Sequence, residues 1–204
     1  MGAINADSLT ALVFAGGRAT RMGGVNKALV PLAGRPLIDR VLERLVPQCA
    51  AAVISANRDA EAFALRGHPV VRDADDDFPG PLAALAAAHA AGVIQTEWVL
   101  TAPCDAPFLP EDLARRFAAA QAECLARGED PDAFTVETAG WPQNTFACLR
   151  RKALAEARPF LDRGERKLGL WYAERGAVKV HFDDEAAFAN LNSPEDIRDA
   201  ERRF

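Results

Sequence analysis

The sequence predicts a single α/β domain with a largely parallel sheet. Short apolar runs alternate along the chain with longer amphipathic stretches, which is typical of repeated strand–helix–strand units. A length of 204 residues is usual for one compact domain. Leu, Ile, Val and Phe together number 49, which is enough to build a core without a disulfide or a structural metal. We therefore expect one domain over residues 1–204.

The first half of the chain predicts four strands separated by helices. A helix is expected at 36–47, because Leu37, Val41 and Leu45 recur at helical spacing after a proline in the first turn. Further helices are expected at 58–65 and 80–91. The strands are short apolar runs at 9–15, 51–55, 69–72 and 97–102.

The second half is less regular. Its longest expected helix spans 110–127 and turns Leu113 and Phe117 toward the core. A last helix begins after Ser193, an N-cap serine followed by a proline and two acids, and runs to about residue 203. Strands are expected at 133–137, 146–149 and 178–182, and shorter helices at 152–161 and 167–175.

The charge of the chain is unevenly distributed. The formal net charge is −5 at pH 7, which argues against a general nucleic-acid binder, because such proteins carry a basic excess. Residues 8–38, however, contain four basic side chains and no acid, whereas residues 73–77 contain four aspartates. A local basic pocket for a small anion is therefore compatible with the acidic total.

Neither a secretory signal nor a membrane span is expected. Residues 1–10 lack a basic stretch followed by an apolar one, and the longest apolar run, 82–94, is too short and too rich in alanine to span a bilayer. The four cysteines match no zinc-site spacing, and reduced thiols are expected. These observations predict a cytoplasmic protein without a membrane or nucleic-acid partner.

A glycine-rich stretch with two cations, FAGGRATRMGGVNK at 14–27, has the clearest functional signal. It follows the first strand directly, where open parallel sheets bind their ligands. Glycines such as Gly16, Gly17 and Gly24 let backbone N–H groups approach a ligand, and Arg21 and Lys27 add positive charge. The spacing fits neither a Walker loop nor a dinucleotide fingerprint. The stretch predicts a phosphate cradle, and the alternative is an ordinary glycine-rich surface turn.

Polar residues also follow the other predicted strands of the first half. Asp105 lies beyond the fourth strand between two prolines, and it can supply the carboxylate that Mg²⁺ takes beside phosphate oxygens. Asp73 ends the third strand, Gly80 starts a helix and Asn57 follows the second strand. The alternatives are a capping role for Asp105, a turn role for Asn57 and a solvated loop for residues 73–77.

Together these segments resemble the molybdenum cofactor guanylyltransferase family, within the wider glycosyltransferase-A-like nucleotidyltransferases. The resemblance runs from residue 12 to 110 and resumes at 188–195. It implies a single-domain, three-layer α/β/α, Rossmann-like fold with a mostly parallel sheet, a nucleotide-binding half at 8–110 and a pterin-side half at 111–204. Seven segments occur in order: AGG-x₃-RMGG-x₂-K, PLIDRVLERLVPQ, SANR, VRD, GPL, PCDAPFLP and NLNSPED.

The resemblance implies transfer of GMP from Mg·GTP to molybdopterin, with Mg²⁺ as cofactor and molybdoenzymes or their chaperones as further partners. It implies catalytic roles for Arg21, Lys27 and Asp105, with Asp105 as the metal ligand. Asn190 and Asn192 match pterin-side positions, although Asn192 could instead cap the last helix. The nucleotide-binding set that it implies is Phe14, Ala15, Gly16, Gly17, Gly24, Lys27, Asn57, Asp73, Gly80 and Asp105.

The residue types suit this chemistry. The terminal phosphate of molybdopterin is already an anion at neutral pH, so no base is needed to activate it, and the seven segments contain no histidine. The barrier arises from repulsion between two polyanions, which Mg²⁺, a lysine, an arginine and backbone N–H groups can offset. We expect in-line attack on the α-phosphorus without a covalent enzyme intermediate.

Three alternatives stay open. A relative that uses CTP usually has Ala-Ala-Gly where this chain has Ala15-Gly16-Gly17, which favours guanine. A sugar-1-phosphate nucleotidyltransferase would need a larger C-terminal half. A catalytically silent binding module need not keep both cations and Asp105. The chain departs from the family pattern at Ala83-Ala84 and at 141–145, and contacts from those positions are left unassigned.

Overall fold

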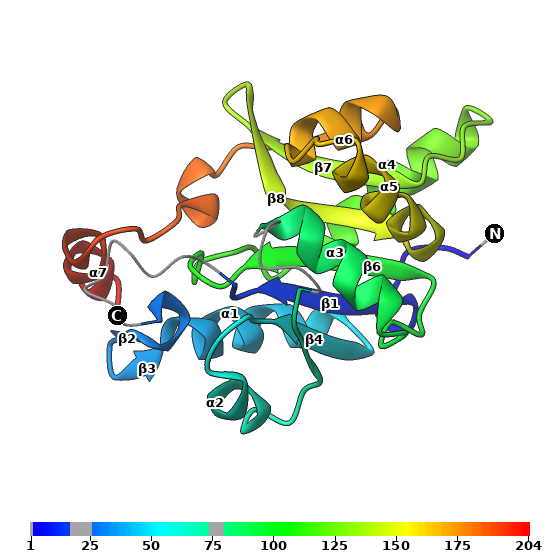
Figure 1. The fold of residues 1–204 in the computed structure, drawn as a ribbon. Coiled ribbons are helices and arrows are strands. Elements are labelled where there is room, and N and C mark those ends of the chain that lie inside the picture. Colours follow the sequence, from blue (N-terminus) through cyan, green and yellow to red (C-terminus); the bar gives the residue numbers. More distant parts are fainter. Residues whose placement is uncertain (1, 17–25, 74–79) are drawn as a thin grey trace.

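The computed structural model describes residues 2–16, 26–73 and 80–204. They form a seven-stranded sheet with helices packed on both faces (Figure 1). The strand order is β5-β4-β1-β6-β8-β7-β9. The predicted three-layer α/β fold is thus confirmed.

Four neighbouring strands on one side of the sheet are parallel. β1 (Leu9–Phe14) lies between β4 (Ala51–Ser55) and β6 (Trp98–Pro103), and the short β5 (Val70–Val71) lies beyond β4. Every residue of β1 is buried, because the strand is central and both its faces are covered. These strands form where the apolar runs predict them, and their carboxyl ends share one edge.

The other side of the sheet is mixed. β8 (Trp141–Arg150) runs antiparallel to both β6 and β7 (Ala133–Thr138), and the edge strand β9 (Val178–Phe182) is parallel to β7. β8 begins well before residue 146, where its apolar run predicts the start. Its first five residues, Trp141 to Thr145, are exposed or only partly buried and form no apolar run.

The pairing of β7 with β8 shifts in register. Thr135 pairs with Ala147, but the next residue, Val136, pairs with Gln143. Residues 144–146 of β8 are therefore left out of the ladder and form a bulge. Bulges of this kind re-aim side chains and are common beside functional sites.

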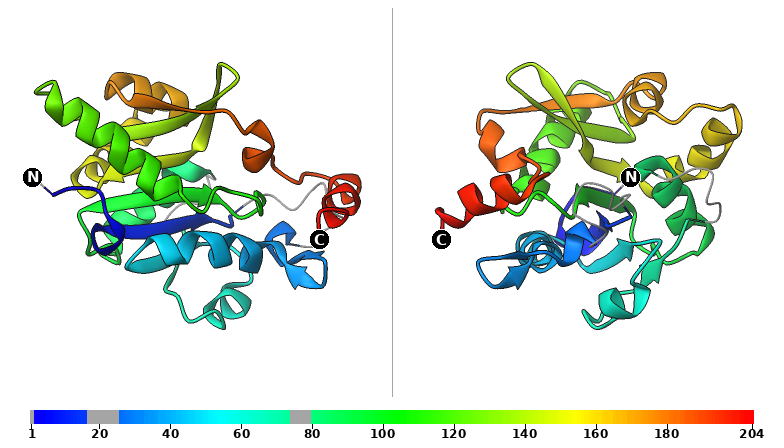
Figure 2. Two further views of the ribbon diagram at one scale, coloured as in Figure 1. Left: turned by 180° about the vertical axis from the view of Figure 1, so that it is seen from behind. Right: turned by 60° about the vertical axis from the view of Figure 1, so that its left-hand side comes forward.

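Two helical layers cover the sheet. β1 contributes alternate side chains to both: Leu9 and Val13 to one hydrophobic cluster, and Leu12 and Phe14 to the other. The first layer is α1 (Leu37–Leu45), α2 (Ala60–Ala64) and α4 (Leu113–Ala126), and the second is α3 (Pro81–Ala90), α5 (Ala157–Asp162) and α6 (Leu168–Glu174). The left panel of Figure 2, which views the molecule from behind, shows α1 and α4 in front of the sheet.

A small hairpin and the last helix, α7 (Pro194–Glu201), pack together at the end of the molecule away from the N-terminus (Figure 1). The hairpin of β2 (Pro31–Leu32) and β3 (Arg35–Pro36) is not predicted by the sequence, because two-residue strands have no periodicity. A small hydrophobic cluster, separate from the two main ones, joins this unit to α1 and to the loop after β6: Leu32, Leu37, Phe108, Leu191, Ile197 and Ala200.

Short 3₁₀ turns connect several of these elements. They are η1 (Ala6–Ser8), η3 (Lys27–Leu29), η4 (Val46–Gln48), η5 (Arg151–Glu156) and η6 (Glu185–Phe188). In the described part of the chain, no helix is long and apolar enough to cross a membrane.

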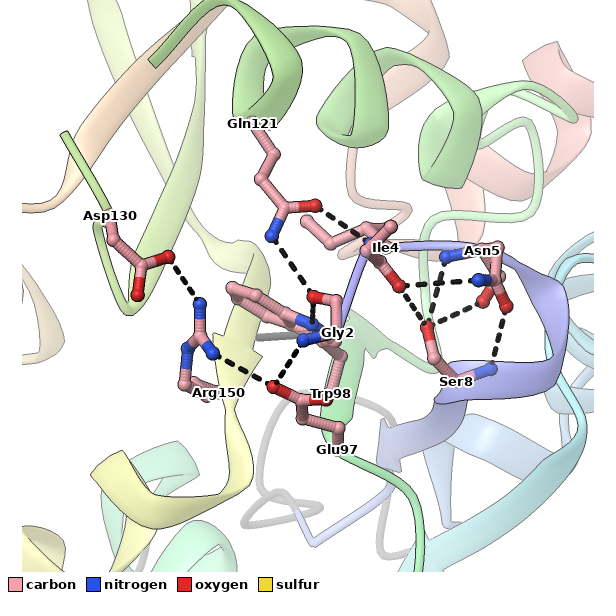
Figure 3. Close-up of polar contacts among 10 residues, drawn as sticks. Gly2, Ile4, Asn5, Ser8, Glu97, Trp98, Gln121, Asp130 and Arg150 are labelled. Carbon is pink, nitrogen blue, oxygen red and sulfur yellow. Dashed lines mark hydrogen bonds and ion pairs between the residues drawn. The ribbon is translucent and has the colours of Figure 1, made fainter. Parts of the chain in front are cut away.

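A polar network holds the N-terminal segment against the amino end of β6 (Figure 3). The Arg150 side chain is 7 % exposed and donates hydrogen bonds to Glu97 at 2.8 Å and to Asp130 at 2.6 Å. Its guanidinium carbon lies 4.5 Å from the centre of the Trp98 ring. The Gly2 N–H donates to Glu97, and the Gly2 carbonyl accepts from the Trp98 indole, both at 3.1 Å.

Replacing Arg150 with methionine is expected to lower the free energy of unfolding by about 2–4 kcal/mol. The change leaves two partly buried carboxylates without their shared cation, while methionine keeps most of the packing on Trp98. Urea unfolding followed by circular dichroism measures the loss. Arg115→Met is the control, because the Arg115–Asp112 pair is largely exposed and is worth under about 1 kcal/mol. Equal losses in the two variants would contradict the expectation.

Candidate functional site

A cavity of about 470 Å³ opens at the carboxyl ends of β1, β4 and β6. This is the edge at which open parallel sheets bind ligands, and the volume suits a small molecule. Segments far apart in the sequence form its wall: Phe14, Ala15, Gly16, Asn26, Lys27, Ala28, Ser55, Asp73, Gly80, Pro81, Ala84, Pro103, Cys104, Asp105, Thr145 and Asn190.

An ion pair lies at the wall of the cavity. The Lys27 ammonium is 2.5 Å from Asp105 Oδ2 and donates a second hydrogen bond to Asn192 Oδ1 at 2.7 Å. Lys27 opens η3, whose N-cap residue Asn26 accepts a hydrogen bond from the Ala28 N–H. The cap therefore sets the direction in which the chain leaves residue 26 and presents Lys27 to the cavity.

Asp105 is held firmly by its backbone. It follows β6, and its carbonyl accepts a hydrogen bond from the Leu191 N–H at 2.8 Å. Its side chain is 15 % exposed, and Oδ1 is buried without a hydrogen-bond partner among the residues that the structure describes. A buried carboxylate oxygen without a partner is costly, so it suits a ligand that supplies positive charge.

A second acidic group lies across β1 from Asp105. Asn57 Nδ2 donates to Asp73 Oδ2 at 2.8 Å, and the Asp73 N–H donates back to Asn57 Oδ1 at 3.0 Å. Burial raises the pKa of Asp73, and the hydrogen bond from Asn57 and the backbone of Gly80 oppose this in part. Asp73 Oδ1 is buried and has no partner among the described residues, so this carboxylate also has an acceptor available to a ligand.

Replacing Asp73 with asparagine is expected to raise the free energy of unfolding at neutral pH. A carboxyl whose folded-state pKa is raised binds its proton more tightly when folded, so its ionisation destabilises the fold as pH rises above the ordinary carboxyl range. Asparagine removes that cost and can still accept from Asn57. Thermal unfolding of both proteins at pH 3 and pH 7 tests this. The stabilisation should be present at pH 7 and shrink toward pH 3, and a difference independent of pH would contradict the cause.

Gly80 opens α3 at the rim of the cavity. Its φ of +147° lies in a region that residues with a Cβ rarely adopt, although a Cβ built there would meet no other atom within 4 Å. Glycine is therefore required by the backbone rather than by space. Pro81 follows in the first turn, and Ala84, one turn further on, also lines the cavity. The methyl group at Ala84 thus borders the cavity, whereas Ala83 does not line it.

Just after β1, the backbone N–H of Gly16 is available to a ligand, whereas its neighbours are used within the sheet. The Ala15 N–H donates to the Ser55 carbonyl at 2.7 Å, and the Phe14 carbonyl accepts from the Cys104 N–H at 3.0 Å. Both groups are thus used within the sheet. The Gly16 N–H, by contrast, has no hydrogen bond to any described residue and borders the cavity.

The Cys104 thiol borders the cavity but is not poised to act as a nucleophile. Burial raises its pKa to about 12, so the group is a neutral thiol at physiological pH. Free thiols are found at all four cysteines, as the sequence predicts.

Most of the predicted site residues meet in this cavity. Arg21, Gly17 and Gly24 lie outside the described residues. Asn57 and Asn192 do not line the cavity but bond to Asp73 and Lys27, which do. The predicted residues that line it are Phe14, Ala15, Gly16, Lys27, Asp73, Gly80, Asp105 and Asn190.

Sequence reasoning missed several lining residues, among them Asn26, Ser55 and Thr145. Ser55 ends a predicted strand and Asn26 lies inside the glycine-rich stretch, so both positions carried a usable signal. Thr145 carried none, because it reaches the cavity from the bulge in β8. The Thr101 hydroxyl holds this bulge by donating to the Thr145 carbonyl at 2.9 Å.

Known proteins resemble the chain in both sequence and structure. A chain from Ralstonia nicotianae, named molybdenum cofactor guanylyltransferase, is 43 % identical over 205 residues, which cover 98 % of this chain and 100 % of the relative. A Burkholderia ambifaria protein of the same name is 44 % identical over 210 residues, covering both chains completely.

Solved structures share the fold at lower identity. Molybdopterin-guanine dinucleotide biosynthesis protein A from Archaeoglobus fulgidus has a TM-score of 0.72 at 24 % identity, covering 95 % of this chain and 97 % of its own. A nucleotidyl transferase from Methanothermobacter thermautotrophicus has a TM-score of 0.68 at 24 % identity, covering 96 % and 98 %. The family described as "MobA-like NTP transferase domain" matches residues 11–177. The chain therefore belongs to the MobA-like NTP transferases and, within them, to the molybdenum cofactor guanylyltransferase family.

Proposed function

We propose that this nucleotidyltransferase moves GMP from GTP to molybdopterin and releases pyrophosphate. The observation that carries the proposal is the Lys27–Asp105 pair, which joins a cation suited to phosphates with a carboxylate whose buried Oδ1 has no partner among the described residues. The full-length relatives named molybdenum cofactor guanylyltransferase support the same reaction. Arg21, in the glycine-rich stretch, is proposed as a second cation for the phosphates.

In this proposal GTP lies across the end of β1. Asp73, on the β5 side, accepts hydrogen bonds from the nucleoside, and Asn57 holds that carboxylate in place. Lys27, which pairs with Asp105 beyond β6, neutralises phosphate charge. Because β4 and β1 lie between β5 and β6 in the sheet, the two acids are on opposite sides of the proposed nucleotide and give it a direction. The Gly16 N–H is a further donor to the nucleotide.

Asp105 is the proposed ligand for Mg²⁺. One carboxylate together with phosphate oxygens is an ordinary Mg²⁺ site, and Asp105 Oδ1 has no competing hydrogen-bond partner among the described residues. No cluster of three or more His, Cys, Asp or Glu side chains occurs among those residues, so a site built by the protein alone is not proposed. Bound there, the metal would offset charge on the reacting phosphates and the departing pyrophosphate.

The transfer forms one bond and breaks another. A phosphate oxygen of molybdopterin attacks the α-phosphorus of GTP, and the bond from that phosphorus to the bridging oxygen breaks to release pyrophosphate. Because the attacking phosphate is already ionised, no side chain has to remove a proton. The residues of the site orient the two polyanions and offset their repulsion. Asn190 and Thr145, on the Asp105 side of the cavity, are proposed to face molybdopterin.

One experiment tests the proposal against its rivals. The protein is incubated with molybdopterin and Mg²⁺ plus either GTP or CTP, and the products are identified by mass spectrometry. We expect the guanine dinucleotide and pyrophosphate in equal amounts, with little product from CTP. Product from CTP alone would identify a cytidylyltransferase, and nucleotide binding without product would identify a silent binding module.

The cellular setting is part of the same proposal. A cytoplasmic protein that makes the guanine dinucleotide would pass it to molybdoenzymes or to their chaperones. We expect the chain to co-purify with such an enzyme when it carries the product and not when it lacks the product.

A further inference from the structure

The two asparagines of the Asn190-Leu191-Asn192 segment make different contacts. The Asn190 side chain borders the cavity and has no hydrogen bond to any residue that the structure describes. The Asn192 side chain uses both of its polar atoms within the protein. Its Oδ1 accepts from Lys27 Nζ at 2.7 Å, and its Nδ2 donates to the Asn190 carbonyl at 3.3 Å.

Hydrogen bonds fix the backbone of this segment at Leu191 and at Asn192. The Leu191 N–H donates to the Asp105 carbonyl at 2.8 Å, and the Leu191 side chain is buried in the cluster beneath α7. The Asn192 N–H donates to Asp196 Oδ2 at 2.7 Å. These contacts hold Asn192 beside the Lys27–Asp105 pair.

Asn192 does not cap α7 with its side chain. That role belongs to Ser193, whose hydroxyl accepts from the Asp196 N–H at 3.1 Å, while Asp196 accepts from the Asn192 and Ser193 N–H groups in return. The hydrogen bond from the Asn192 backbone, followed by those from Ser193, lowers the pKa of Asp196. Asp196 is therefore ionised at neutral pH and keeps the turn in place.

The chemistry of the two partners of Lys27 explains why an amide is useful here. Asp105 neutralises the ammonium, whereas the Asn192 amide oxygen accepts its hydrogen bond and leaves its charge intact. If Asp105 gives its oxygens to Mg²⁺, as the proposed function requires, Asn192 still holds the ammonium at the cavity. Lys27 then keeps its full charge for the phosphates.

We propose that Asn192 is a positioning residue that acts through Lys27 and that Asp196 fixes Asn192. This inference rests on the proposed function, because it assigns parts of that same site.

A double-mutant cycle separates an indirect role from a direct one. We expect Asn192→Ala to lower kcat/KM for GTP about tenfold, the usual size of a hydrogen bond to a charged group. In a Lys27→Ala background the same change should cost less than about twofold, because its partner is already gone. Asn190→Ala should instead raise KM for molybdopterin by a similar factor in both backgrounds. Multiplicative effects of Asn192→Ala and Lys27→Ala would overturn the positioning role.

A matched pair tests Asp196. Ser193→Ala and Asp196→Ala each remove one half of the capping box of α7, so both should lower the melting temperature by a similar amount. Only Asp196→Ala removes the acceptor that fixes the Asn192 N–H. We expect kcat/KM to fall several-fold in Asp196→Ala and to stay unchanged in Ser193→Ala. Equal activities at equal melting temperatures would show that the carboxylate serves the helix alone.

Binding measurements keep this inference distinguishable from the proposed function. The same cycle is run on the Kd of GTP, by calorimetry with and without Mg²⁺. If the wild-type chain binds GTP but transfers no GMP, the function fails, while non-additive Kd values still support the positioning role. If transfer occurs and the cycle is additive, the function stands and the positioning role fails. A wild-type chain that binds no GTP would overturn both.

Discussion

Asp105→Asn is expected to lower Mg²⁺-dependent turnover by on the order of 10³-fold, while GTP binding weakens much less. The change is isosteric, so Lys27 keeps an acceptor at this position. It removes the negative charge from a carboxylate whose Oδ1 is buried without a partner among the described residues. Loss of that charge removes the proposed metal ligand without emptying the cavity wall.

Steady-state turnover across a range of Mg²⁺ concentrations, with GTP affinity measured separately, tests this expectation. Asp162→Asn is the control, because the Asp162 side chain is 54 % exposed, pairs with Arg158 on the surface and lies outside the cavity. Its turnover should match the wild type. Unchanged turnover in Asp105→Asn would remove Asp105 from the metal site.

Lys27→Ala is expected to remove about 2–4 kcal/mol of transition-state stabilisation, which lowers kcat/KM roughly 30- to 10³-fold. The ammonium lies at the cavity with two fixed hydrogen-bond acceptors, so it is oriented before substrate arrives. A preorganised cation offsets charge as the pyrophosphate leaves and needs no reorganisation at that moment. Lys27→Arg should restore little, because a planar guanidinium does not reproduce the geometry of a point charge between Asp105 and Asn192.

Single-turnover kinetics with GTP and molybdopterin separate this loss from a change in product release. Lys152→Ala is the matched control, since Lys152 is exposed in η5 and lies outside the cavity. It should leave the rate of GMP transfer unchanged. A kcat/KM for Lys27→Ala equal to that of the control would show that Lys27 takes no part in the reaction.

The central strands and the layer arrangement could be predicted because their signals are local. β1, β4 and β6 are apolar runs of strand length, and α1 repeats Leu37, Val41 and Leu45 on one face. The start of β8 could not be predicted in this way. The residues from Trp141 to Thr145 have no strand-like alternation, and their pairing comes from neighbouring strands rather than from their own composition.

The same distinction applies to the site. Asp73 and Asp105 could be placed together because parallel strands present their carboxyl ends at a common edge. The contact between Lys27 and Asn192 could not, because it joins residues 165 positions apart and depends on how α7 packs. The sequence leaves two roles open for Asn192, a helix cap and a ligand contact. In the structure its side chain instead accepts a hydrogen bond from Lys27.

The small cluster beneath α7 predicts unequal stability within the molecule. Its six residues are separate from the two large clusters that hold the sheet. We therefore expect α7 and the β2–β3 hairpin to open as a unit at a lower free energy than global unfolding. In that open form Asn192 would leave Lys27, while β1 and β6 would stay paired. If Asn192 positions Lys27 as proposed, heating should silence the enzyme before the sheet melts.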